Sequence, residues 1–262
     1  MKILAIISSH RKNGHTSKVI SLLKEEMNNI ALKNQEYIEF EKLFLGDHEI
    51  NHCKGCRACM DRGEEYCPWK DDIPLIKSKI KDSDAVIFAS PVFVGDVSSS
   101  MKALIDRLAY ICHRQEFYDK CALILATTNA TSLKRTIHTM GAAMYSWGFK
   151  TLGTKGFKTS SSNDSKEKLS KRYHKDISKL ALKFYSGVKK RSYLKPSALS
   201  LATFKLQQKY RANPELSPPI DYYYWKEQGW TDQKRTYYIE HDARMATKFC
   251  SKILYGLFSI IF

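Results

Sequence analysis

The segment at positions 8–17 carries side chains well suited to binding an anion. It reads SSHRKNGHTS and lies between an apolar run, Ile3–Ser8, and an amphipathic helical pattern that begins at Thr16. Its hydroxyls, its guanidinium and the free N–H groups of a helix start form a set of donors for a phosphate monoester. The segment has neither the Walker A spacing nor the GxGxxG dinucleotide fingerprint. It therefore indicates a phosphate site of another kind, with an ordinary capped turn as the alternative.

Four of the seven cysteines lie between positions 53 and 67. Cys53, Cys56, Cys59 and Cys67 form the pattern C-x2-C-x2-C-x7-C, and Pro68 follows the last cysteine. Three thiolates at intervals of three can converge on one iron–sulfur cluster, and a fourth completes the ligand set. The spacing is too compact for common zinc sites, while thiols without a metal remain an alternative. Clustered cysteines in odd number are typical of a reducing compartment, so we expect a cytoplasmic protein.

Five apolar runs alternate with amphipathic patterns over the first 189 residues. The runs that predict strands are Ile3–Ser8, Tyr37–Leu45, Ala85–Ala89, Cys121–Ala126 and Gly148–Gly156. The patterns that predict helices are Thr16–Lys33, Ile73–Lys81, Ser98–Cys112, Thr131–Trp147 and Lys166–Lys189. This alternation predicts an α/β fold with a doubly wound, five-stranded parallel sheet and helices on both faces. Ligands of such sheets bind beyond the carboxyl ends of the strands, which directs attention to the loops after the first, third and fourth strands.

The last part of the chain differs in composition. The net charge is +16, and residues 158–262 carry 21 basic against 9 acidic side chains. Prolines and the aromatic segment DYYYWKEQGW interrupt the strand–helix rhythm beyond residue 190. We therefore expect a ligand-binding domain at 1–189 and a basic, aromatic-rich extension at 190–262. The aromatic segment is expected to cover either the ligand or a partner subunit.

The basic extension raises the question of an anionic partner. No nucleic-acid-binding motif accompanies the charge, so nucleic acid is not expected. The apolar tail Ile253–Phe262 follows Lys248 and Lys252, a pattern that fits peripheral contact with a membrane surface better than nucleic-acid binding. Packing of this tail within the protein, on the domain or on a second subunit, is favoured over both. No apolar stretch approaches the ~20 residues that span a bilayer.

Three segments in the same order resemble the NADPH-dependent FMN reductases of the flavodoxin-like superfamily. SSHRKNGHTS resembles the SxRxxGxT phosphate loop of that family, and ASPVFVGDVSSSMKALIDR resembles its second signature. TTNATSLKRTIHTMGAAMYSWGF resembles the stretch around its fourth strand. The cysteine spacing is similar to that of the iron–sulfur flavoprotein branch, in which it holds a [4Fe-4S] cluster. The resemblance covers residues 1–185.

The resemblance implies a site for FMN and a site for a cluster. The residues implied to hold the FMN phosphate are Ser9, Arg11, Gly14, Thr16 and Ser17. Those implied to lie along the isoalloxazine ring are Pro91, Val92, Phe93 and Val94. Thr127, Thr128 and Asn129 would form a third wall, and Cys53, Cys56, Cys59 and Cys67 would be the metal ligands. The chain departs from the family at His15, where Asn is common, and at Asn129-Ala130, where Gly is frequent.

The function implied is that of an NAD(P)H-dependent flavin oxidoreductase. Electrons would pass from NAD(P)H through FMN, with a [4Fe-4S] cluster as a possible relay, to an unidentified acceptor; a homodimer or higher oligomer is expected. No catalytic acid–base residues are expected, because the cofactor carries the chemistry. For Lys102, Asp106 and Arg107, the helical spacing indicates scaffold or subunit contact. The alternative function is a non-enzymatic electron carrier reduced by a ferredoxin-type partner. A positive surface favours docking to an acidic redox protein in either case.

Overall fold

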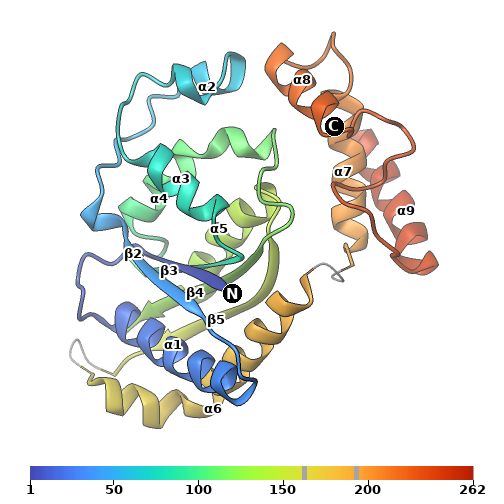
Figure 1. The fold of residues 1–262 in the computed structure, drawn as a ribbon. Helices are drawn as coiled ribbons and strands as arrows, with labels where there is room; N and C mark the ends of the chain where they lie inside the picture. Colours follow the sequence, from blue (N-terminus) through green and yellow to red (C-terminus); the bar gives the residue numbers. More distant parts are fainter. Residues whose placement is uncertain (161–163, 192–194, 262) are drawn as a thin grey trace.

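A five-stranded parallel sheet forms the centre of the structure, a computed structural model that describes residues 1–160, 164–191 and 195–261. The strands are β1 (Lys2–Ile7), β2 (Glu39–Phe44), β3 (Ala85–Pro91), β4 (Cys121–Thr128) and β5 (Lys150–Lys158). Their order is β2-β1-β3-β4-β5, with every neighbouring pair parallel (Figure 1). This is the flavodoxin-like doubly wound order, so the predicted fold class is confirmed. Phe262, the last residue of the predicted apolar tail, lies outside the described residues.

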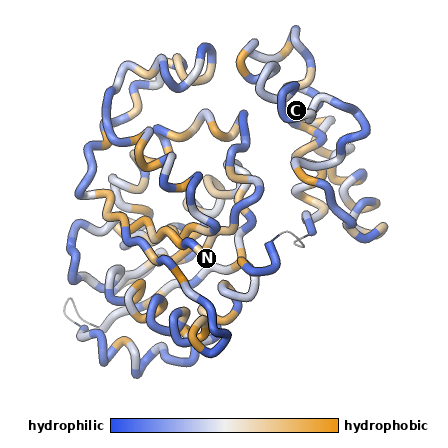
Figure 2. Tube along the Cα trace, viewed as in Figure 1, coloured by the Kyte–Doolittle hydropathy of each residue, from blue (hydrophilic) through white to orange (hydrophobic). Residues whose placement is uncertain are grey.

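Helices cover both faces of the sheet because successive strand residues point to opposite sides. On β1, Ile3, Ala5 and Ile7 belong to the apolar core formed with α1 (His15–Lys33) and α6 (Lys166–Lys189). Leu4 and Ile6 belong to the core on the other face. The helices of that face are α3 (Ile73–Lys81), α4 (Ser99–Arg107) and α5 (Leu133–Ser146). Figure 2 shows hydrophobic residues gathered along the central strands, with hydrophilic residues on the surrounding helices.

Most element boundaries differ from the prediction by one or two residues, and the end of α4 differs by five. The helix expected over Ser98–Cys112 ends at Arg107, and the chain continues as the 3₁₀ helix η3 (Ala109–Cys112). The strand expected from Gly148 begins at Lys150, because Gly148 has φ +98° and belongs to the preceding turn.

In the described part of the C-terminal extension, the α-helices are α7 (Ala198–Arg211), α8 (Pro219–Glu227) and α9 (Met245–Ile261). The proline-rich sequence predicted an interrupted pattern here, and the prolines at 214, 218 and 219 do lie between α7 and α8 or at the first helical position of α8. Phe204, Trp225, Trp230 and Tyr238 form a buried aromatic cluster within the extension. The expected division into domains at residue 189 coincides with the end of α6 and stays a prediction.

A buried carboxylate joins the extension to the α/β part. Asp221 on α8 is fully buried and accepts hydrogen bonds from Arg114 Nη1 at 2.5 Å and from the ring of His113, with 2.8 Å between Oδ2 and Nδ1. Arg211 Nη1 lies 3.2 Å from the same carboxylate. Trp225 Nε1 donates to the carbonyl of His113 at 2.8 Å. The aromatic segment thus packs on α7 and on the residues that follow η3 in its own chain, and none of its residues lines the cavity that contains the predicted FMN residues.

One further property concerns membranes. Within the part of the chain that the structure describes, no helix has both the length and the apolar character needed to cross a bilayer.

Candidate functional site

The loop between β1 and α1 is held in a tight turn. Gly14 N donates to Arg11 O at 2.9 Å, and a Cβ added to Gly14 would lie 3.0 Å from that same oxygen. Ser9 Oγ accepts a hydrogen bond from Arg11 N at 3.3 Å. Ser9 and Gly14 therefore shape the loop, and the guanidinium of Arg11 is left available. The first turn of α1 contains no acidic residue, which suits an anion at this helix start.

A cavity of about 160 Å³ lies at the carboxyl ends of β1, β3 and β4. Eight of the twelve predicted FMN residues line it: Arg11, Thr16, Pro91, Val92, Phe93, Thr127, Thr128 and Asn129. The hydroxyls of Thr16 and Thr127 are 2.7 Å apart and join the phosphate loop to the end of β4. The lining contains no Asp or Glu and includes the guanidinium of Arg11 and four threonine hydroxyls. These residues fit a phosphate monoester with an aromatic ring beside it, which is the shape of FMN.

The other four predicted residues do not line this cavity. Ser9 and Gly14 lie in the loop, as described above, and Ser17 is buried in α1. Val94 is fully exposed at the tip of a turn in which Phe93 and Asp96 exchange backbone hydrogen bonds of 2.8 and 3.0 Å. Val94 has φ +46°, a strained conformation for a β-branched residue. Such strain is typical of functional loops, but the side chain points into solvent.

Two cavity residues, His15 and Thr159, were not predicted. His15 Nε2 accepts a hydrogen bond from Asp164 N at 3.1 Å, which ties the start of α1 to the loop after β5. Burial and the charge of Lys18 lower the pKa of His15, against an opposing effect of Asp164. The imidazole is therefore neutral at pH 7, as an acceptor must be. Thr159 N donates to Thr128 O at 2.8 Å, a pairing across the sheet that no local pattern reveals.

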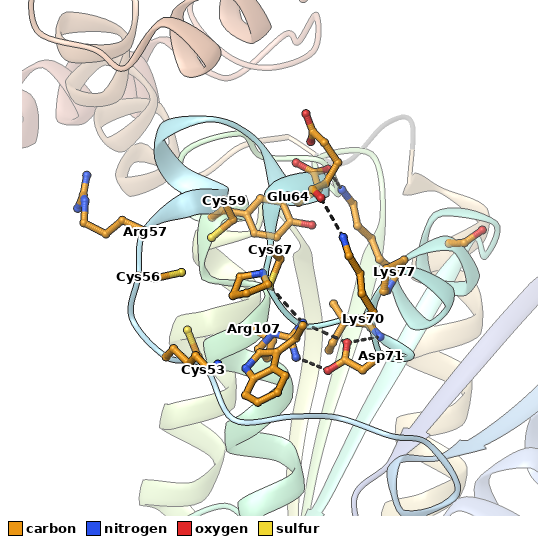
Figure 3. A pocket seen from close by; sticks show the side chains of 18 of the residues that line it. Cys53, Cys56, Arg57, Cys59, Glu64, Cys67, Lys70, Asp71, Lys77 and Arg107 are labelled. Carbon is orange, nitrogen blue, oxygen red and sulfur yellow. Dashed lines mark hydrogen bonds and ion pairs between the residues drawn. The ribbon is translucent and has the colours of Figure 1, made fainter.

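The predicted metal ligands share a second cavity of about 560 Å³ (Figure 3). Cys53, Cys56, Cys59 and Cys67 all line it, on a loop that contains α2 (Ala58–Asp61) and the 3₁₀ helix η2 (Glu64–Tyr66). A third 3₁₀ helix, η1 (Leu45–Asp47), links this loop to β2. Cys53 and Cys56 are exposed, whereas Cys59 and Cys67 are half-buried. Burial raises the pKa of the Cys59 thiol, and the neighbouring Cys53 and Cys67 raise it further.

A buried ion pair between Arg107 and Asp71 contacts the cysteine loop. Arg107 on α4 is bonded through both terminal nitrogens to the carboxylate of Asp71, and both side chains are almost completely buried. The same guanidinium donates to Asn51 O at 3.1 Å and lies 3.5 Å from Cys67 Sγ. Burial raises the pKa of Asp71, but hydrogen bonds from Arg107 and from the N–H groups of Asn51 and Ile73 outweigh it and lower the pKa below its usual value. Arg107 therefore stabilises the cysteine site. Its position in the helical pattern did not predict this role. The exposed Lys102–Asp106 pair has the predicted i, i+4 contact, at 2.6 Å.

The spacing of the four thiols bears on the kind of metal centre they can hold. Among the described residues, no group of three or more His, Cys, Asp or Glu side chains is close enough to hold a single metal ion. The four thiols instead line part of a cavity of about 560 Å³, whose wall also carries six basic and three acidic side chains. Thiolate donors with positive charge nearby suit an anionic iron–sulfur cluster better than an isolated ion. The donor set therefore fits the predicted cluster in chemistry.

Helix α4 connects the two cavities. Its N-cap residue Ser98 follows the loop of Pro91 and Phe93, and Ser98 Oγ is 2.7 Å from Ser8 Oγ at the start of the phosphate loop. Its last residue, Arg107, contacts Cys67. The nine residue steps from Ser98 to Arg107 correspond to about 14 Å of helix rise. The two candidate sites therefore lie near opposite ends of α4.

The strand order defines a flavodoxin-like α/β protein. The chain belongs to the NADPH-dependent FMN reductase family, whose profile matches residues 1–164. It is a member of a flavin oxidoreductase family.

Curated relatives extend the comparison beyond the family profile. An iron-sulfur flavoprotein of Archaeoglobus fulgidus is 29% identical over 231 residues, which are 87% of this chain and 99% of the relative. An iron-sulfur flavoprotein of Methanocaldococcus jannaschii is 41% identical over 107 residues, which are 41% of this chain and 51% of the relative.

Solved structures agree on the fold. A flavone reductase matches with a TM-score of 0.55 and 15% identity over 72% of this chain and 63% of its own. RosB with a bound intermediate matches with a TM-score of 0.53 and 15% identity over 95% of this chain and 93% of its own. At this identity the likeness concerns the fold alone.

Proposed function

We propose that this protein is an FMN-dependent NAD(P)H oxidoreductase of the iron–sulfur flavoprotein type, with FMN and a [4Fe-4S] cluster as cofactors. The observation that carries the proposal is the presence in one chain of two cavities, one suited to a phosphate-bearing ring and one lined by four thiols. The iron-sulfur flavoprotein relatives support the same combination.

In this proposal Arg11 and the N-terminus of α1 bind the FMN phosphate, because a guanidinium and free N–H groups complement its charge. Thr16 and Thr127 hold the phosphate loop against β4 through their 2.7 Å contact. The loop of Pro91, Val92 and Phe93 lies along the ring. Bound FMN supplies hydride acceptance and one- or two-electron exchange. The neutral His15 keeps the loop after β5 in place and takes no part in proton transfer.

The cysteine loop would hold the cluster through Cys53, Cys56, Cys59 and Cys67. Arg107 offsets negative charge at Cys67, and the exposure of Cys53 and Cys56 leaves this site accessible from solvent. A cluster bound there supplies one-electron exchange with an acceptor. The acceptor, whether a small molecule or a ferredoxin-like protein, would therefore approach from the cysteine side. A homodimer or higher oligomer and a cytoplasmic location belong to the same proposal.

The first test is the anaerobic absorption spectrum of the purified protein, with iron and sulfide assays on the same sample. We expect flavin bands and about four irons per chain. Replacing the four cavity cysteines by serine should remove the iron and keep the flavin. Cys250→Ser is the matched control, because Cys250 is an exposed thiol on α9 and not part of the cavity lining. A protein that binds no FMN, or whose iron is unaffected by the cavity substitutions, would contradict the proposal.

The electron donor is tested on the same sample. Addition of NADPH or NADH should bleach the flavin bands within the mixing time of a rapid-kinetics instrument. Bleaching by reduced ferredoxin alone would instead assign the protein as an electron carrier without nicotinamide activity.

A further inference from the structure

Helix α9 exposes a row of apolar side chains along its length. The row consists of Met245, Phe249, Ile253, Leu257 and Ile260, which are 51–84% exposed. Spacings of four and three residues place them on one face of the helix. From Met245 to Ile260 the face extends over about 22 Å by helix rise. Single exposed apolar residues are ordinary on protein surfaces, but a continuous row of large ones indicates a binding surface.

The opposite side of α9 is already occupied. Leu254 and Phe258 are partly buried, and α9 packs along α7. In Figure 1, α9 lies on the far side of α7 from the sheet. The α/β part of the chain therefore does not cover the apolar row.

Positive charge accompanies this surface. Helix α7 contains Lys205, Lys209 and Arg211, and α9 contains Lys248 and Lys252, while neither helix contains Asp or Glu. Arg211 is held by the buried Asp221. A cavity of about 590 Å³ between the two helices is lined by Lys205, Lys209 and Lys252 together with polar side chains. The apolar face of α9 therefore lies next to a polar cavity whose charged side chains are all positive.

We propose that α9 docks this protein on the surface of an anionic phospholipid bilayer. The apolar row enters the boundary between headgroups and acyl chains, as amphipathic helices with basic flanks do. Lys248 and Lys252 reach the lipid phosphates from the edge of this face, and the polar cavity with Lys209 accepts headgroup oxygens.

The charge argues for lipid over a second copy of the chain. A symmetric dimer formed through this face would bring the same residues of both copies together. The lysines of one α9 would then face those of the other, and neither α7 nor α9 offers a carboxylate to neutralise them. An anionic lipid surface provides the opposite charge over the whole row.

The test is co-sedimentation of the full chain with vesicles of phosphatidylcholine alone and of equal parts phosphatidylcholine and phosphatidylglycerol. We expect binding to the anionic vesicles that weakens with added salt. Lys248→Gln with Lys252→Gln should lower the partition coefficient roughly thirty-fold. Ile253→Gln with Leu257→Gln should lower it more than about tenfold. All four side chains are exposed, so their replacement should not affect folding.

Matched controls lie on α6. Lys171→Gln with Lys175→Gln removes two exposed lysines at the same spacing, and Leu182→Gln removes an apolar side chain that is 55% exposed. Neither control should change the partition by more than about twofold. Absence of binding to the anionic vesicles, or equal losses in the α6 and α9 variants, would overturn the proposal. If Ile253→Gln with Leu257→Gln dissociates an oligomer in sedimentation velocity and leaves vesicle binding unchanged, the face is an interface between copies and the proposal is wrong.

Discussion

Arg107 shows how much one residue's role depends on contacts that are remote in sequence. The helical pattern indicates a scaffold residue, yet its guanidinium lies between Asp71 and the sulfur of Cys67, 36 and 40 positions away. The hydrogen bond between His15 and Asp164 joins positions separated by 149 residues. Residue types and loop positions predicted most of the cavity lining. These supporting contacts could not be predicted, because they depend on which loops the sheet brings together.

The buried ion pair gives the first prediction. Arg107→Leu leaves the carboxylate of Asp71 buried without its cation, so we expect the free energy of unfolding to fall by about 3–5 kcal/mol. Lys102→Leu is the control, because the Lys102–Asp106 pair lies on the same helix but is exposed. Its effect should stay within about 1 kcal/mol. Urea unfolding of the three proteins without added cofactor measures both. An equal decrease in the free energy of unfolding of the two variants would show that burial does not strengthen the contribution of the Arg107–Asp71 pair.

The neutral imidazole of His15 gives a prediction about pH. Its pKa is lowered below 6.5 in the folded state, so the unfolded chain binds the proton more readily. The contribution of His15 to stability is therefore complete above pH 6.5 and is lost as the pH falls from 6.5 toward the folded-state pKa. His15→Asn removes this titration and keeps an oxygen that can accept the Asp164 N–H. Melting temperatures measured between about pH 5 and pH 8 should fall less steeply with acid in the variant. Parallel curves for the two proteins would contradict this assignment.

At the scale of elements, the pattern of apolar runs located all five strands. The signal is strongest in β1, β3 and β4, which are buried along most of their length, whereas the edge strands β2 and β5 are only partly buried. The ends of elements were less predictable. Cys112 fits the apolar face of the preceding helix, yet the α-helix ends at Arg107, where the side chain turns to Asp71. The sequence pattern did not predict helices α7 and α8, for a different reason. Their stability depends on the aromatic cluster of Phe204, Trp225 and Trp230, which forms only in three dimensions.

The turn that begins β5 provides the prediction at this scale. Gly148 has φ +98°, and an added Cβ would lie 3.0 Å from the backbone nitrogen of Tyr118. Gly148→Ala is expected to lower the free energy of unfolding by about 3 kcal/mol, from the conformation and the close contact together. Gly229→Ala is the matched control, since Gly229 has φ +69° and no atom within 4 Å of its added Cβ. In Gly229→Ala, the free energy of unfolding should fall by only about 1 kcal/mol, the cost of the positive φ alone. Urea midpoints of the two variants measure the difference, and equal values would mean that the backbone of Tyr118 moves freely aside.

At the scale of the whole molecule, Arg114 joins three parts of the structure. Its Nη1 donates to Asp221 of α8, and its Nη2 donates to the carbonyl of Cys59 in the cysteine loop at 2.7 Å. The same guanidinium stacks over the ring of Tyr110 in η3, 5.2 Å from its centroid. The basic extension is therefore connected to the candidate cluster site through one buried side chain. Loosening α8 should change the environment of Cys59 without touching the cysteine loop directly.

Asp221→Asn tests this connection, because an amide cannot neutralise the buried Arg114 and the neighbouring Arg211. We expect faster hydrogen exchange in α8 and faster alkylation of Cys59 in metal-free protein, because Arg114 then no longer holds the Cys59 carbonyl. Alkylation of Cys250, an exposed thiol on α9, should keep its rate. Glu227→Gln is the control on the same helix, since Glu227 is exposed. If α8 exchanges faster while the alkylation of Cys59 is unchanged, the extension and the cysteine loop are independent. If both rates rise together, the extension keeps the cysteine loop in the conformation in which four thiols face one cavity.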